Sequence, residues 1–244
     1  MAFAAEGLPD GLRLDGATGR ITGSVAVKGT YPVVLRARNA RGAAEKKFRI
    51  VCGDTIALTP PMGWSTWYMA YTDISDAMVR AQAEAMVSTG LADHGYSYVN
   101  IDDGWNIKLG SNDPAVGGEP RDAAGNIRPN RNFPDMKALC DHVHGLGLKI
   151  GIYISPGPST CAGYAGSFGR EEQDARQFAA WGFDFLKYDW CSYTGVAPDK
   201  SLESLKKPYI LMGGILARLG RDIVYNLCQY GMGDVWEWGR EVGG

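Results

Sequence analysis

FDFLKYD (183–189) is a short, largely apolar run that predicts a buried β-strand ending in the carboxylate of Asp189. A carboxylate at the tip of a buried strand loses its hydration, so it needs either an ion-pair partner or a functional use. Because alternate residues of a strand point to the same face, Lys187 and Asp189 share one face of this strand. Either the two side chains pair with each other, or both contact one ligand.

Similar strand-like runs recur from Leu58 onward and alternate with helical patterns. The predicted strands are 62–67, 96–101, 148–154, 183–189 and 222–228, and the predicted helices are 75–89, 133–145, 171–181 and 201–219. Repeated βα units predict a parallel sheet, either closed into a barrel or open and doubly wound. Polar residues at the C-terminal ends of successive strands favour a barrel. A complete (β/α)₈ TIM barrel needs about 250 residues, so we expect one truncated after about five strands.

Residues 1–53 follow a different pattern, in which short β-prone runs alternate with turn signals. The β-prone runs are 12–14, 31–37 and 45–51. This pattern predicts a partial β-sandwich that lacks its opening strands, because a complete immunoglobulin-type sandwich needs about 100 residues. We therefore expect two domains, the sandwich module over 1–53 and the N-terminal part of the barrel over 54–244.

Two adjacent acids, Asp102 and Asp103, follow the strand predicted over 96–101. Neighbouring carboxylates raise each other's pKa, so the pair needs a cation or several hydrogen-bond donors. Carboxylates suit the hydroxyl groups of a sugar, but Ca²⁺ and Mg²⁺ use the same oxygen ligands. Taken alone, the two residues leave a sugar site, a metal site and a structural role open. Trp67 and Tyr153, near other strand ends, are either core residues or platforms for a sugar ring.

Composition narrows the class of protein. With 45% hydrophobic and 21% charged residues the chain is expected to fold, and a net charge of −2 without a basic stripe excludes nucleic-acid binding. No run of 18 apolar residues predicts a membrane span, and residues 1–10 lack the features of a secretory signal. The cysteines match no CxxC metal pattern and, taken alone, indicate reduced thiols at positions 52, 140, 161, 191 and 228.

Two resemblances cover most of the chain. The segment LPDGLRLDGATGRITGSVAVKGTYPVVLRARNARGAAEKKFRI (8–50) resembles the immunoglobulin-like repeats of bacterial surface and secreted proteins. The part over about 58–240 resembles glycoside hydrolase family 27, the α-galactosidases and α-N-acetylgalactosaminidases. The matching runs are TPPMGW (59–64), IDDGW (101–105), NFPDMKALCDHVHGLGLKIGIY (132–153), TCAGYAGSFGREEQDARQFAAWGFDFLKYDWC (160–191) and NLCQYG (226–231). This resemblance implies a (β/α)₈ barrel and a double-displacement mechanism that retains the anomeric configuration, with no cofactor.

The resemblance also implies roles for single residues. Asp189 matches the nucleophile, and Lys187 matches a lysine that contacts substrate hydroxyls. Asp102 and Asp103 match the pair that holds the 4- and 6-hydroxyls of galactose. Asp at 103 favours galactose, since some arabinopyranosidases of the family have Glu there. The remaining implied roles are a pocket lined by Trp67 and Tyr153, a loop near the sugar's 2-position with Cys228 and Gln229, and a disulfide between Cys161 and Cys191.

Two details concern the 2-position and the cysteines. Many family members have Glu where this chain has Gln229, so specificity at the 2-position stays open. The implied disulfide replaces the reading of Cys161 and Cys191 as thiols and indicates an oxidising compartment. We therefore expect a secreted or periplasmic protein whose signal peptide is not in this chain.

The second catalytic carboxyl group is expected outside this chain. A retaining glycosidase needs two carboxyl groups about 5–5.5 Å apart. The family's acid/base aspartate follows a WR-containing motif, which the resemblance puts beyond Gly244. Asp234 and Glu237 lie in a Gly/Trp-rich stretch and are interpreted as loop residues. Residues 1–244 alone are therefore expected to be inactive.

The sequence thus predicts an enzyme that releases terminal α-linked galactose from small or oligomeric galactosides through a covalent galactosyl-enzyme. Two alternatives within the enzyme class are an α-N-acetylgalactosaminidase and a β-L-arabinopyranosidase. The alternative from another class is a non-catalytic galactoside-binding or surface-adhesion fragment. No metal is expected at the site.

Overall fold

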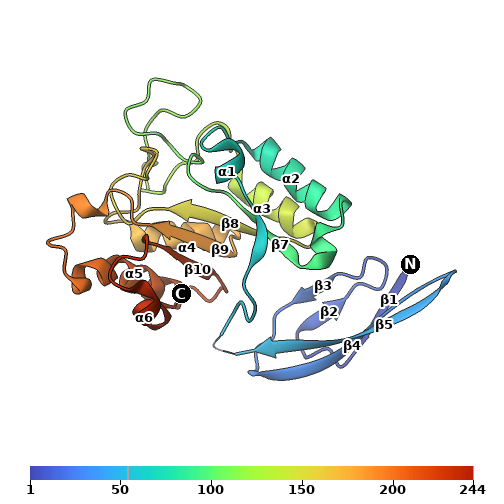
Figure 1. Cartoon of the computed structure of the whole chain (residues 1–244). Coiled ribbons are helices and arrows are strands. Elements are labelled where there is room, and N and C mark those ends of the chain that lie inside the picture. The colour runs from blue at the N-terminus through green and yellow to red at the C-terminus, as the bar shows by residue number, and fades with distance from the viewer. Residues whose placement is uncertain (54, 244) are drawn as a thin grey trace. The chain divides into compact units, whose positions relative to one another are not determined.

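The chain forms two compact units, which divide after Thr59. The computed structural model describes residues 1–53 and 55–243 (Figure 1). Asp54, at which the second predicted domain begins, and Gly244, at which it ends, lie outside the described residues. Among the described residues, no helix combines the length and apolar character needed to cross a membrane.

The first unit is built from antiparallel strands. One sheet has the order β1-β4-β5, and a separate pair is formed by β2 and β3. The strands are β1 (Ala2–Glu6), β2 (Leu12–Leu14), β3 (Ile21–Gly23), β4 (Gly29–Asn39) and β5 (Gly42–Cys52). In residues 1–53 only Pro9 and Val33 are buried, so this unit has a small core of its own. The sequence predicted three of its strands and missed β1 and β3, which are short.

The second unit contains a parallel sheet with the strand order β10-β9-β8-β7-β6. Each strand pairs with its neighbour along the chain, as in a barrel and unlike the reversed order of a doubly wound sheet. The strands are β6 (Met62–Ser65), β7 (Tyr96–Asn100), β8 (Lys149–Ile154), β9 (Phe185–Asp189) and β10 (Val224–Cys228). The five strands and their curl confirm the predicted barrel arrangement over the part of the chain that the structure describes.

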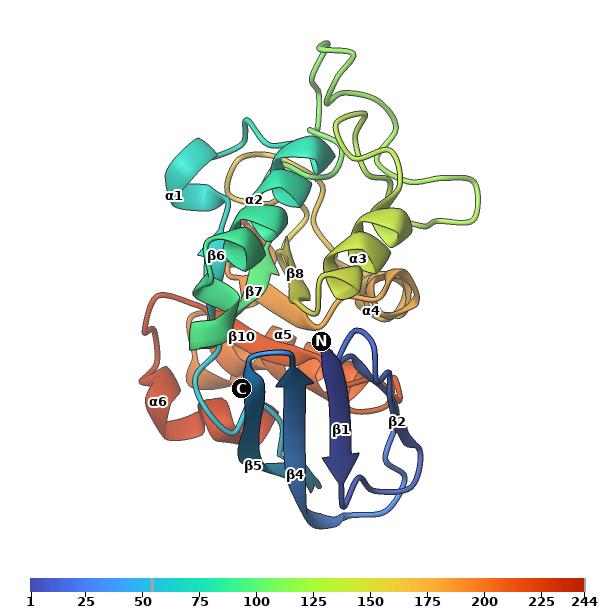
Figure 2. The ribbon, with the colours of Figure 1, turned by 90° about the vertical axis from the view of Figure 1, so that its right-hand side faces the viewer.

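Helices connect the strands and pack in the same order as the strands do. The contacts run from α2 to α3, from α3 to α4 and from α4 to α5, so the helices cover one face of the sheet (Figure 2). The long helices are α2 (Asp76–Ser88), α3 (Met136–Gly145), α4 (Glu171–Trp181) and α5 (Leu202–Leu216). Shorter helical turns are α1 (Trp67–Ala70), α6 (Val235–Trp238), η1 (Leu91–His94), η2 (Tyr193–Gly195) and η3 (Gly239–Val242).

Capping side chains account for where the helices begin. The hydroxyl of Ser75 accepts a hydrogen bond from the N–H of Met78, and the carboxylate of Asp135 accepts one from Ala138. Asp135 therefore starts α3 at Met136, three residues later than the sequence predicted. The strand predicted over 62–67 ends at Ser65, because Trp67 already belongs to α1.

A core of aromatic and branched side chains fills the space between the sheet and the helices. Trp105, the last residue of IDDGW, is fully buried, and its indole N–H donates to the carbonyl oxygen of Tyr153 at 2.7 Å. Its ring packs edge-to-face on Phe178 of α4 at a centroid distance of 5.8 Å. The hydrogen bond and this packing link the segment after β7 to β8 and to α4, and so fix the position of the two acids that precede Trp105.

A charged cluster ties the sheet to its helices at the amino end of β9. The carboxylate of Asp184 lies 2.8 Å from Nε2 of His144 and 2.8 Å from the guanidinium of Arg221. It also accepts the N–H of Ile150 at 3.0 Å. Burial alone would raise the pKa of Asp184, but the His144 hydrogen bond, the Ile150 N–H and the Arg221 charge together hold it below its ordinary value.

We predict that Asp184→Asn lowers the free energy of unfolding by about 3 kcal/mol at pH 7, because it leaves Arg221 without its anionic partner. The folded pKa lies below the unfolded one, so this stabilisation is present at neutral pH and is lost as the pH falls through the folded pKa. Urea unfolding at several pH values should show a difference from wild type at neutral pH that closes as the pH falls below the ordinary value of 3.8.

Asp141→Asn is the matched control, because Asp141 pairs with Lys137 on the exposed surface of α3. Its effect should stay below about 0.5 kcal/mol. If both variants behave alike, or if the Asp184→Asn difference persists at pH 2, the cluster does not carry this stability.

Candidate active site

Polar side chains gather at the carboxyl ends of the central strands. Asp102 and Asp103 follow β7, Tyr153 belongs to β8, and both Lys187 and Asp189 belong to β9. The parallel register sets Tyr153 beside Lys187. The three acids are nearly inaccessible to solvent, at 5% for Asp102, 1% for Asp103 and 6% for Asp189. Burial of three carboxylates at one sheet edge demands hydrogen-bond donors for each of them.

The carboxylate of Asp189 receives one tyrosine hydroxyl on each oxygen. Tyr153 donates to Oδ2 at 3.0 Å, and Tyr230 donates to Oδ1 at 2.6 Å. Burial, followed by nearby charges, raises the pKa of Tyr153 well above its ordinary value. For Tyr230, burial is again the largest cause, followed by the hydrogen bond to Asp189. Both hydroxyls therefore stay protonated and act as donors at neutral pH.

Lys187 pairs with Asp102 and not with its strand neighbour Asp189. Its ammonium group lies 2.7 Å from Oδ2 of Asp102, and it passes 5.1 Å from the ring centre of Tyr153. Burial disfavours the ammonium charge, but the Asp102 carboxylate outweighs this and raises the pKa of Lys187. Lys187 is therefore charged at neutral pH and neutralises one of the three acids. The backbone N–H of Asp102 in turn donates to the hydroxyl of Thr66 at 2.9 Å.

Asp103 is held by neutral donors from one loop. The hydroxyl of Thr160 donates to Oδ1 at 2.7 Å, and the N–H of Ala162 donates to Oδ2 at 2.8 Å. Burial is the largest influence and raises the pKa of Asp103 to about 6, against the lowering effect of these two hydrogen bonds. The neighbouring Asp102 also raises it, by less than burial does. The mutual effect of adjacent acids thus has the predicted sign, but it is not the main cause.

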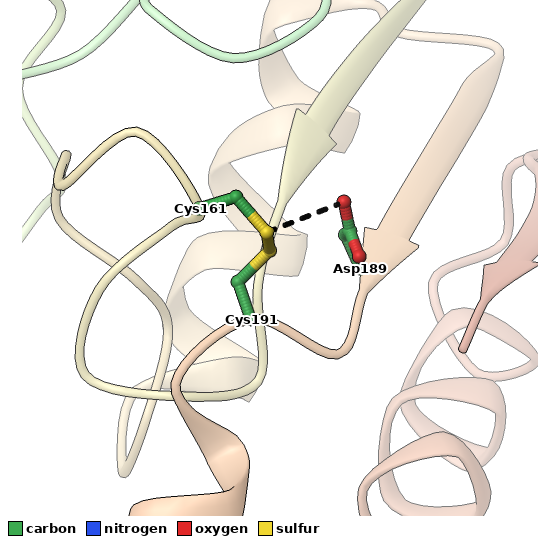
Figure 3. A group of neighbouring side chains, drawn as sticks. All are labelled: Cys161, Asp189 and Cys191. Carbon is green, nitrogen blue, oxygen red and sulfur yellow. Dashed lines mark hydrogen bonds between the residues drawn. A yellow bond between two sulfur atoms is a disulfide. The ribbon is translucent and has the colours of Figure 1, made fainter. Parts of the chain in front are cut away.

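A disulfide joins Cys161 to Cys191 beside the nucleophile candidate, with their Cα atoms 4.9 Å apart (Figure 3). The pairing that the resemblance implied is confirmed, and the other cysteines are free: Cys52, Cys140 and Cys228. Sγ of Cys161 lies 3.9 Å from Oδ2 of Asp189. A disulfide sulfur carries no proton, so this is a packing contact. The same bond removes both thiolates, so the cluster of Cys161, Asp189 and Cys191 offers no thiolate ligand to a metal ion.

A cavity of about 240 Å³ is lined largely by residues of the same sheet. Trp67, Asp102 and Lys187 are among its lining residues. The cavity therefore brings an aromatic ring, a carboxylate and an ammonium group to one space. Such a combination can hold a polyhydroxylated ring by its apolar face and its hydroxyl groups.

Comparison with known proteins agrees with this geometry. Residues 59–238 match the family model described as "Alpha galactosidase A". The chain belongs to the α-galactosidase A family. Residues 1–53 match the family model described as "Putative Ig domain". Both resemblances predicted from the sequence are thereby confirmed.

Individual members of the α-galactosidase A family are similar over most of this chain. The protein named alpha-galactosidase A from Cellvibrio japonicus is 41% identical over 192 residues, which are 78% of this chain and 43% of that protein. A Bacteroides fragilis structure described as a "putative alpha-galactosidase/melibiase" is 39% identical, with a TM-score of 0.89 over 100% of this chain and 49% of that one. The Saccharomyces cerevisiae α-galactosidase with raffinose is 34% identical, with a TM-score of 0.68 over 77% of this chain and 39% of that one. This chain therefore spans less than half the length of each of these relatives.

Of the two residues predicted near the 2-position, Cys228 lies beside Asp189 and Gln229 is turned into its own loop. Cys228 is the register partner of Asp189, and burial raises the pKa of its thiol to about 11, so it is a neutral thiol at pH 7. Gln229 is 1% exposed, and its side-chain N–H donates to the carbonyl oxygen of Met232. Gln229 thus holds its own loop together. Its side-chain oxygen has no hydrogen-bond partner among the described residues.

Sequence reasoning did not single out Thr160 and Tyr230. Tyr230 lies inside the matched run NLCQYG (226–231), next to Gln229. The match identified this loop but did not indicate which of its side chains contacts Asp189. Thr160 begins the matched run over 160–191, where Cys161 drew the interpretation. Both contribute hydroxyl donors to buried carboxylates.

We predict that Thr160→Val raises the pKa of Asp103 from about 6 by about one unit, because it removes a hydrogen bond that favours the charged carboxylate. The carboxyl ¹³C shift of Asp103, followed through a pH titration by NMR, measures this. Thr160→Ser keeps the hydroxyl and should leave the titration near that of wild type. An unchanged or lowered pKa in the valine variant would contradict this account of Asp103.

Proposed function

We propose that this chain supplies the nucleophile and the galactose-binding residues of a retaining α-galactosidase. The observation that carries the proposal is Asp189, which ends β9 with a tyrosine hydroxyl on each carboxylate oxygen and lies at the same sheet edge as Asp102 and Asp103. Membership of the α-galactosidase A family over residues 59–238 supports the same assignment. By this proposal the protein cleaves terminal α-linked galactose from galactosides, such as the oligosaccharide raffinose seen with the yeast relative.

In the proposed first step, a carboxylate oxygen of Asp189 attacks the anomeric carbon and the bond to the leaving-group oxygen breaks. The leaving oxygen takes a proton from a second carboxyl group, and we assign that role to no residue among 1–53 and 55–243. In the second step, water attacks the same carbon and gives its proton to the second carboxyl group, which is now a carboxylate; the bond to Asp189 breaks, and the Asp189 carboxylate returns. The two inversions together retain the anomeric configuration. The step needs no cofactor.

The sugar would be held by the residues around the cavity. Asp102 and Asp103 accept the 4- and 6-hydroxyls, Lys187 donates to neighbouring hydroxyls, and Trp67 packs against the apolar face of the ring. Tyr153, the register partner of Lys187 in the sheet, would complete the sugar pocket with its ring and its hydroxyl. The ammonium group of Lys187 supports this reading. It has three N–H donors, and its hydrogen bond to Asp102 uses one of them, so the others can donate to a ligand.

Cys228 and Gln229 come from the loop that the resemblance puts near the 2-position. Gln229 is 1% exposed and hydrogen-bonded within its own loop, so we propose that it shapes the loop near the 2-position and does not contact the substituent directly. Asp at position 103 supports galactose over an arabinopyranoside. The loop after β10 would determine whether the sugar carries a 2-hydroxyl or a 2-acetamido group. A non-catalytic galactoside-binding role is the alternative from another class, and the first experiment below separates it from catalysis.

We also propose the compartment and the domain division. The disulfide beside Asp189 supports a secreted or periplasmic location, because such bonds persist in oxidising compartments. We propose an immunoglobulin-like module over 1–53 and the galactosidase part over 54–244. The match of separate family models to 1–53 and 59–238 supports this division.

We predict that Asp189→Asn, in the full protein as its gene encodes it, lowers turnover of nitrophenyl α-galactoside by at least about 10³-fold, since an amide cannot form the galactosyl ester. The loss should be equally large with α-galactosyl fluoride. Fluoride departs without a proton, so this substrate reports on the nucleophile and is insensitive to the acid. Steady-state kinetics and an unfolding curve are the measurements.

Asp234→Asn is the control, because Asp234 is an exposed loop residue and its loss should change kcat/KM by less than about twofold. Near-normal turnover in Asp189→Asn would refute the nucleophile assignment. A wild-type protein that binds galactose but hydrolyses neither substrate would favour the binding role.

The pocket should also discriminate between epimers at C4. We predict that kcat/KM for nitrophenyl α-galactoside exceeds that for the α-glucoside by about 10⁴-fold, because a site built to hydrogen-bond one hydroxyl strands its buried acceptors when that hydroxyl points away. The buried acceptors are Asp102 and Asp103. Comparable values for the two substrates would show that these acids do not read the 4-hydroxyl.

A further inference from the structure

Tyr230 contacts the nucleophile candidate from outside the strand that carries it. It follows β10, whereas Tyr153 belongs to β8, and the sheet order β10-β9-β8 puts Asp189 of β9 between them. The two hydroxyls therefore reach the carboxylate from strands on opposite sides. The bond from Tyr230 is the shorter, at 2.6 Å against 3.0 Å.

The backbone of this loop is shaped to deliver the side chain of Tyr230. Its φ angle is 63°, in the left-handed region that residues with a Cβ rarely adopt, and Gly231 follows with φ 77°. Two hydrogen bonds within the loop fix its conformation. The side-chain N–H of Gln229 donates to the carbonyl oxygen of Met232, and the N–H of Met232 donates to the carbonyl oxygen of Gln229. A strained conformation that the surroundings hold in place at a site is a reason to look for a function.

The environment of the hydroxyl suits a permanent donor. Tyr230 OH also lies 3.4 Å from Sγ of Cys161 and 3.5 Å from Sγ of Cys191, so the disulfide limits its position. Disulfide sulfurs are weak acceptors, and the carboxylate is the strong one. The proton of the hydroxyl is therefore directed to Oδ1 of Asp189.

We propose that Tyr230 is a positioning residue that stabilises Asp189 as the leaving group of the second chemical step. This rests on the proposed function. In the first step the carboxylate loses its charge as its bond to the anomeric carbon forms. In the second step an oxygen of water bonds to that carbon while the second carboxyl group takes the water's proton, the ester bond to Asp189 breaks, and the charge returns to the Asp189 carboxylate. A donor to the carboxylate strengthens as that charge develops, so it lowers the barrier of the second step.

The same reasoning gives opposite consequences for the two steps. A hydrogen bond that stabilises the free carboxylate makes it a weaker attacking group and a better leaving group. Removal of the hydroxyl should therefore slow hydrolysis of the galactosyl-enzyme and leave its formation unchanged or slightly faster. Simple damage to the pocket would instead slow formation of the intermediate and weaken substrate binding.

The test is Tyr230→Phe in the full protein as its gene encodes it, assayed with α-galactosyl fluoride, whose first step is fast. We expect kcat to fall about tenfold, as for loss of a hydrogen bond to a charged group. KM should fall in proportion, because the galactosyl-enzyme accumulates, so kcat/KM should stay within about threefold of wild type. Rapid mixing should show a burst of fluoride close to one equivalent of enzyme.

Tyr193→Phe is the matched control, since it removes a hydroxyl from a tyrosine whose ring packs against Trp190 at a centroid distance of 4.9 Å. Tyr193→Phe should have the same kcat, the same KM and the same fluoride burst amplitude as the wild-type protein. An unfolding curve for each variant shows that the fold is retained.

Unchanged kcat in Tyr230→Phe, or a raised KM with a lowered kcat/KM and no burst, would overturn the role of Tyr230 while wild-type turnover and the Asp189→Asn loss still support the proposed function. A wild-type protein without turnover of the fluoride would instead count against the proposed function itself. The two failures are therefore distinguishable.

Discussion

Three carboxylates are buried at one edge of a parallel sheet, and the arrangement of the site depends on how each is compensated. A buried carboxylate without partners is too costly to keep its charge. Asp102 is paired with the ammonium group of Lys187, whereas Asp103 and Asp189 are compensated by neutral donors. Neutral donors stabilise a charge while adding none, so they leave the carboxylate able to react or to accept a ligand hydroxyl. The type of donor, charged for Asp102 and neutral for Asp103 and Asp189, therefore distinguishes the three acids chemically.

The disulfide connects two of these acids mechanically. Cys161 lies between Thr160 and Ala162, the two residues that hold Asp103. Its partner, Cys191, lies two residues after Asp189. One covalent bond thus sets the loop around Asp103 against the end of β9. A displacement of that loop would shift Asp103 and Asp189 relative to each other, and the cross-link opposes it.

The sequence was sufficient for the acids and for the edge on which they meet, because strand ends and the parallel connection rule are local and topological. Strand alternation put Lys187 and Asp189 on one face, but it could not choose the partner of Lys187. That choice depends on the neighbouring strand: Lys187 extends past the ring of Tyr153 on β8 and reaches Asp102 after β7. Such reach across a strand is a property of the folded sheet and has no signal in the spacing of residues.

The loop after β10 was harder for the same reason. The run CQYG indicated a loop near the sugar, and the resemblance drew attention to Gln229, but side-chain direction there is set by backbone angles. The left-handed conformation of Tyr230 turns its hydroxyl to Asp189, while Gln229 is buried in the loop itself. A non-glycine residue in this conformation is not marked in a sequence, so which of two adjacent residues faces the site could be read only from the structure.

The charge of Asp103 depends on pH. Burial raises the pKa of Asp103 to about 6 although Thr160 and Ala162 both donate to it, so its carboxylate is the form present above that pH. A ligand hydroxyl donates a stronger hydrogen bond to the carboxylate than to the protonated acid, and would therefore draw Asp103 further towards the charged form. By linkage, such a ligand binds more tightly as the pH rises through about 6, with release of a proton below it. Asp102 instead carries a fixed counter-charge, the ammonium group of Lys187 at 2.7 Å. The proposed sugar-binding pair is therefore one acid with a fixed counter-charge and one whose charge a ligand would help to stabilise.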